Sequence, residues 1–265
     1  MSISPTMKEG HEAAINGNES PGSRSATQVP PSRPKPSPSI NEAVIDRYHP
    51  KDPATGDIVP DNIVSRLSVA VGAARLAAEK AQRVAEAIMA NEFWTVAARH
   101  KAVQDKCHRI TEPVLSTLDN ALAACRKEIE TLTTKTAGPP RPQDAAGYFL
   151  ASEVRQRLAS LSNEDREAAF AQALADEDEA ALGAVLVGSP MLSGITKARQ
   201  QMLRAAWQKQ RFAPELARIE RLQKALTDTE RAGTLTLNYS LSLSSAAIVA
   251  RAEASDRVMR EALDS

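Results

Sequence analysis

The chain has 265 residues, with 33 basic and 33 acidic side chains, 42% apolar residues and only 3% aromatic residues. A formal net charge of zero argues against a generally basic nucleic-acid-binding protein. No apolar run approaches the roughly 18–20 residues that a transmembrane helix needs, and the first residues lack the charged and apolar regions of a secretory signal. We therefore expect no membrane contact and a location in the cytoplasm, or in a virion if a phage carries the gene.

Proline is concentrated at the start of the chain, since ten of the 16 prolines lie within residues 1–60. This stretch has no sustained apolar periodicity, so it buries too little surface to offset a chain entropy of about 1–2 kcal/mol per ordered residue. The composition predicts a flexible Pro/Ser-rich arm over 1–60. The arm is either a linker or disordered tail, or a segment that extends along a partner, and the sequence leaves both open.

A long-helix module follows at 61–135. Asp61 is a predicted N-cap, and apolar residues recur after it at spacings of three and four over about 30 residues. Most of them are alanine, which allows another helix to approach closely but buries little area per residue.

A second stretch, from Val96 to Leu132, has heptad-type spacing with one stutter. Pro113 lies beside the stutter, so we expect a break or kink near 111–113. The module is then a hairpin or coiled coil of two or three long helices.

The run at 136–142 contains Gly138, Pro139 and Pro140 and predicts a linker, because such a cluster does not continue a helix. A second helical module is expected at 143–265. Its first two predicted helices are 145–161, capped by Asp144, and a helix that begins after a Ser162 cap. A short helix is predicted from the acids at 176–179 to about 188. A long helix is predicted from Thr196, with a kink at Pro214 and an end at Gly233, and a tail helix at 246–263. The fold class is therefore all-α and elongated, with an extended or disordered arm.

Residues 234–243 are ambiguous because leucine or tyrosine alternates there with threonine, serine or asparagine, which is the period of a strand. No second strand is predicted to pair with it. A partner's sheet edge, a ladder between copies, or a helix would each resolve the pattern, and we favour a helix or an extended linker because the surroundings are helical.

Metal and catalytic chemistry find little support. His100, Cys107, His108 and Cys125 share one region, but their spacings along a helix do not bring them around one ion. The two cysteines lie on the apolar seam and are expected to be reduced core residues. The acids at 176–179 lack a calcium-loop pattern, and no nucleophile elbow, phosphate loop or dinucleotide fingerprint is present. We expect no metal, no cofactor and no enzymatic activity.

Charge is distributed unevenly in the second module. Residues 161–182 contain seven acids and one base, whereas 195–214 contain five bases and no acid. The two segments either face each other within the chain, pair between subunits, or leave the basic helix free for nucleic acid. The candidate partner-binding residues are Lys197, Arg199, Arg204, Trp207, Lys209, Arg211, Asp176, Glu177, Asp178 and Glu179.

The stretch from Glu153 to Phe170 (EVRQRLASLSNEDREAAF), followed by Ala184–Val185–Leu186 and by SPMLSG at 189–194, resembles uncharacterised alanine-rich helical proteins of proteobacterial phages and prophages. The resemblance covers about 40 residues. It implies a virion-associated or morphogenetic setting and transfers no functional residue.

These patterns predict a non-catalytic structural or assembly protein, a homo-oligomer or part of a larger assembly, that acts through helix packing and its arm. The alternative is a nucleic-acid-associated regulator that uses the basic segment at 195–214.

Overall fold

A computed structural model describes residues 35–139 and 141–264, and within these ranges the chain is helical and has no strand. The predicted all-α fold is confirmed. The helices are α1 (Ala43–Asp46), α2 (Asn62–Met89), α3 (Val96–Thr136), α4 (Ala145–Ser160), α5 (Asn163–Ala175), α6 (Glu179–Val187), the 3-10 helix η1 (Pro190–Ser193), α7 (Lys197–Arg211), α8 (Ala213–Ser242) and α9 (Ala246–Leu263).

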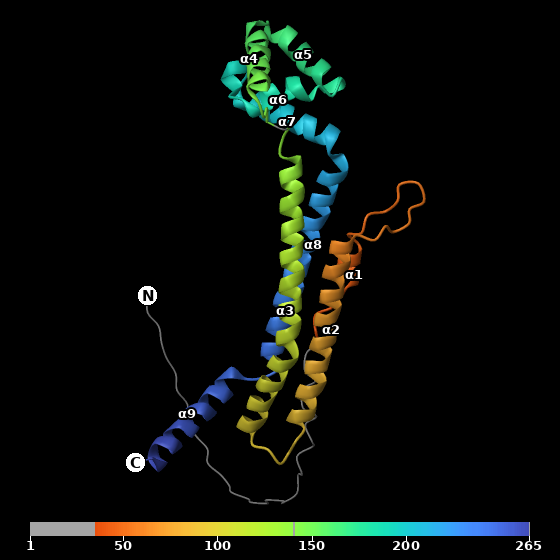
Figure 1. Cartoon of the computed structure of the whole chain (residues 1–265). Coiled ribbons are helices and arrows are strands. Elements are labelled where there is room, and N and C mark those ends of the chain that lie inside the picture. The colour runs from red at the N-terminus through yellow and green to blue at the C-terminus, as the bar shows by residue number, and fades with distance from the viewer. Residues whose placement is uncertain (1–34, 140, 265) are drawn as a thin grey trace, which may run out of the picture. The chain divides into compact units, whose positions relative to one another are not determined.

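The three long helices α2, α3 and α8 lie side by side (Figure 1) and share one core. Asp61 caps α2 as predicted, because its carboxylate accepts a hydrogen bond from the Ile63 N–H at 2.9 Å. Helices α3 and α8 are antiparallel, since Lys135 pairs with Glu215 while Arg126 pairs with Glu230. The core face of α2 is mostly alanine, so the helices approach closely.

Helix α3 passes through Pro113 without interruption, so of the predicted break or kink near 111–113 the break is wrong. Proline removes one backbone N–H and crowds the preceding turn, but Thr111 and Leu118, on either side of it, are buried and keep this part of the helix packed. The predicted module at 61–135 therefore contains two long helices, joined by a short loop.

Helix α8 differs from its prediction at both ends. Pro214 lies in the first turn of a new helix, where proline is tolerated, and not at a kink in a helix continuous with α7. Gly233 does not end the helix. Positive φ angles, which a helix-ending glycine adopts, occur among the described glycines at Gly56 and Gly194.

Residues 234–242 lie in α8 and Leu243 is its C-cap, so of the favoured alternatives, a helix or an extended linker, the helix is observed. Tyr239 and Leu243, four residues apart, are buried, whereas Leu237 and Leu241 are exposed. The leucine and tyrosine side chains are therefore divided between two faces of one helix.

The predicted arm at 1–60 needs correction in its second part. Residues 1–34 lie outside the described residues, but Ile40 and Ile45 are both 1% exposed and belong to the core of the long helices. Glu42 pairs with Arg75 on α2 at 2.8 Å. These two isoleucines therefore anchor the segment to the long helices, although its average composition predicts a free arm.

A separate small core joins α5, α6 and α7, and is formed by Phe170, Leu182, Val185, Leu186, Leu203 and Trp207. Helix α3 ends at Thr136 and α4 begins at Ala145, and the described residues between them are not helical. Helices α8 and α9, however, pack against α3, so the predicted second module at 143–265 divides between two cores. The second core ends with α7.

Arg166 stabilises the turn between α4 and α5. Its side chain donates hydrogen bonds to the carbonyl oxygens of Leu158 (2.8 Å), Leu161 (2.7 Å) and Gly194 (2.6 Å), and the residue is 8% exposed. These carbonyls include groups at the end of α4 that have no partner within the helix. The guanidinium therefore replaces water at the helix end.

Candidate functional site

The predicted acidic and basic segments meet within the chain. Arg211 on α7 lies 3.2 Å from the carboxylate of Glu177 and 3.1 Å from that of Glu179. Arg199 forms a two-pronged ion pair with Glu167 on α5, in which its Nε donates at 2.8 Å. Of the three explanations for the uneven charge, the structure shows the contact within the chain.

Two further residues of the basic segment serve the backbone and the core. Arg204 donates to the carbonyl oxygens of Ala137 (2.7 Å) and Leu186 (2.5 Å), and so connects α7 to the linker. Trp207 is buried, with its ring edge-on to Phe212 at a centroid distance of 5.3 Å.

The remaining acids have local partners. Asp178 caps α6 by accepting from the N–H groups of Ala180 and Ala181, and Asp176 accepts from the side chain of Gln172. Two residues of the predicted set, Lys197 and Lys209, have exposed side chains that form no hydrogen bond or ion pair with the described part of the chain.

The described residues contain no group of three or more His, Cys, Asp or Glu side chains placed to hold a metal ion. Cys107 and Cys125 are buried thiols, as predicted. Burial raises the pKa of Cys125 to about 11, so its thiol stays protonated and unreactive near neutral pH.

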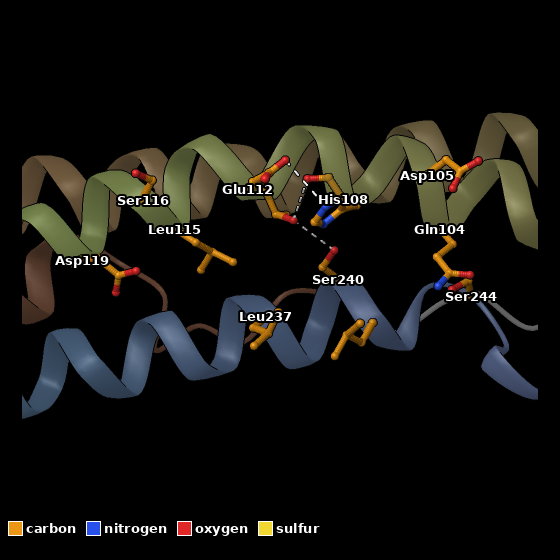
Figure 2. Close-up of a pocket in the computed structure, with 12 residues that line it drawn as sticks. Gln104, Asp105, His108, Glu112, Leu115, Ser116, Asp119, Leu237, Ser240 and Ser244 are labelled. Atoms are coloured by element: carbon orange, nitrogen blue, oxygen red, sulfur yellow. Dashed lines mark hydrogen bonds and ion pairs between the residues drawn. The ribbon is translucent and has the colours of Figure 1, made fainter.

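A groove of about 590 Å³ runs between α3 and α8 (Figure 2). On α3 it extends from Gln104 to Asp119, and on α8 from Leu237 to Leu241, with Ser244 at one end. The groove cannot be predicted from local sequence patterns, because it forms between residues more than 100 positions apart.

The groove combines apolar and acidic groups. Leu115, Leu237 and Leu241 provide its apolar surface. Thr111, at its base, lies with its hydroxyl 3.5 Å from that of Ser240.

Three carboxylates, those of Asp105, Glu112 and Asp119, line α3 at intervals of seven residues, and seven residues bring a helix back to nearly the same face. His108 lies 3.6 Å from Glu112, and both side chains are largely exposed. An elongated apolar floor with an acidic edge suits an amphipathic helix with basic flanks.

The loop between α2 and α3 exposes a second apolar surface. Phe93 is 99% exposed, and the neighbouring Trp94 and Val96 are about half exposed. In a chain that is only 3% aromatic, two adjacent aromatic side chains at one loop form an unusual surface.

Comparisons of the chain with protein-family models, curated proteins and solved structures found no match. Within the part of the chain that the structure describes, no helix has the length and apolar character to cross a membrane.

Proposed function

We propose that the protein is a non-catalytic structural or assembly component that acts through protein–protein contacts and forms a homo-oligomer or part of a larger assembly. The observation that carries this proposal is the exposed aromatic pair Phe93 and Trp94 in the loop between two long helices. Exposed apolar clusters rimmed by polar residues mark interaction surfaces. The resemblance of 153–194 to phage proteins supports a virion or its morphogenesis as the setting.

Light scattering coupled to size-exclusion chromatography tests this function over a hundredfold range of protein concentration. The wild-type chain should form oligomers, and F93S/W94S should dissociate at a concentration at least tenfold higher. The matched control is Met191→Ser, which removes an exposed apolar side chain from η1. A wild-type chain that stays monomeric throughout would contradict the proposal.

A nucleic-acid-associated regulator remains the alternative, and the structure leaves it little of the predicted surface. Arg199, Arg204 and Arg211 already bind groups of the same chain. Lys197 and Lys209 are the basic side chains of this segment that stay exposed and available to a nucleic acid. Salt-dependent binding to duplex DNA or RNA, abolished by K197E/K209E, would favour this alternative.

A further inference from the structure

Helix α9 presents an apolar stripe that the described part of the chain covers only at the start of the helix. Val249 is its buried residue, and Glu253 pairs with Lys101 on α3 at 3.8 Å. Beyond that pair, Met259 and Leu263 are 62% and 82% exposed. These two residues lie four apart and so share one helix face. Met259 and Leu263 therefore form an apolar face that stays exposed in the second half of α9.

We propose that residues 254–263 of α9 from a second copy of this chain occupy the groove between α3 and α8 (Figure 2). The inference rests on the proposed assembly function and names the partner at one of its surfaces. Two copies that exchange α9 in this way form a closed dimer with twofold symmetry.

The dimensions agree. At 1.5 Å per residue, the α3 wall from Gln104 to Asp119 is about 22 Å long, and residues 254–263 of α9 make a helix of about 15 Å that fits within it. The groove presents Leu115, Leu237 and Leu241 to the incoming helix. Met259 and Leu263 are the side chains that would fill the space between them.

The charges are complementary as well. At 100° per residue, Arg260 lies on one flank of the stripe formed by Met259 and Leu263. With that flank towards α3, it would meet the carboxylates that line that helix. Asp256 lies on the same flank and would face the α3 wall where His108 stands between the acids. Contact between the grooves of two copies would instead place carboxylates against carboxylates, which disfavours that arrangement.

The occupant belongs to a second copy because α9 crosses its own α3. The Ser245 N–H donates to His100 Nδ1 at 3.0 Å, and Glu253 pairs with the next residue, Lys101. Eight residues of α9, about 12 Å, therefore advance by one residue along α3, about 1.5 Å. A helix that crosses at this angle does not run along Gln104–Asp119 of the same chain.

Cysteine cross-linking of the full chain tests the contact. L241C protein is mixed with size-tagged M259C protein and oxidised mildly; the two native thiols are buried and stay reduced. We expect a mixed disulfide dimer well above the level that either variant forms alone. Replacing L241C with Val69→Cys, an exposed position on α2, is the control and should give background cross-linking.

Light scattering provides the second measurement. M259D/L263D should raise the concentration at which dimers dissociate at least tenfold, with an unchanged helical circular dichroism spectrum. Glu112→Arg and Arg260→Glu should each weaken the dimer about two- to fivefold, the range of exposed ion pairs, and together restore it.

The outcomes separate this inference from the proposed function. Oligomers that persist in M259D/L263D without the mixed disulfide would overturn the α9 exchange and leave the assembly function standing. A cross-link confined to single chains of the double variant L241C/M259C would also overturn it, because α9 would then fill its own groove. A monomeric wild type would overturn both.

Discussion

Leu222→Ala tests whether α8 is part of the long-helix core. Leu222 is 0% exposed, and its carbonyl lies 3.7 Å from the thiol of Cys125 on α3. Truncating a buried leucine to alanine costs about 2–5 kcal/mol, in proportion to the cavity that remains. Three helix backbones surround this site and limit its collapse, so we expect a loss of about 3 kcal/mol in the free energy of unfolding. That is a large part of the total stability of a typical domain, about 5–15 kcal/mol.

Urea unfolding followed by circular dichroism at a fixed protein concentration measures the loss, and thermal unfolding should shift by about 6–12 °C for a protein of this size. Leu76→Ala is the matched control, because Leu76 is 57% exposed on α2 and its truncation should cost under about 0.5 kcal/mol. A loss below about 1 kcal/mol would refute the shared core of α2, α3 and α8.

Three further predictions concern individual side chains. Arg166→Met should expose the end of α4 to faster amide hydrogen exchange, because unpaired buried carbonyls cost about 1–3 kcal/mol each. Cys107 and Cys125 should not react with Ellman's reagent in the native protein at pH 8, and both should react in denaturant. Burial alone would raise the pKa of Asp61, but hydrogen bonds from Arg218 and from the start of α2 lower it overall. Its stabilising effect is therefore present above its ordinary pKa near 3.8 and is lost as pH falls through the lower folded-state value, so urea midpoints below pH 4 should fall less steeply in Asp61→Asn.

Helix starts were predictable because capping is local. Asp61, Asp144 and Ser162 each accept a hydrogen bond from a backbone N–H two or three residues ahead, at the positions that the sequence indicates. The interaction depends on a few adjacent residues and needs no knowledge of the fold.

Helix ends and long-range packing were less predictable, because both depend on distant residues. Gly233 stays inside α8 where that helix lies against Leu118 of α3, more than 100 residues away. The attachment of Ile40 and Ile45 has the same origin, since a short apolar pair is informative only once the surface that receives it is known. The groove between α3 and α8 could not be predicted without the pairing of those two helices.

The charge distribution shows how one pattern can support opposite functions. The sequence places the base-rich segment 195–214 after the acid-rich segment 161–182. Both nucleic-acid binding and assembly require that these charges face outward. The structure shows Arg199 and Arg211 bound to acids of segment 161–182, which reduces the charge available to a nucleic acid or to another protein.

Counting the charges of each segment does not reveal the acids on α3, because basic residues surround them in the sequence. Only the helix face reveals that Asp105, Glu112 and Asp119 line one groove. Interaction surfaces in this alanine-rich protein are therefore better sought from the arrangement of charges on helix faces than from the charge of a segment.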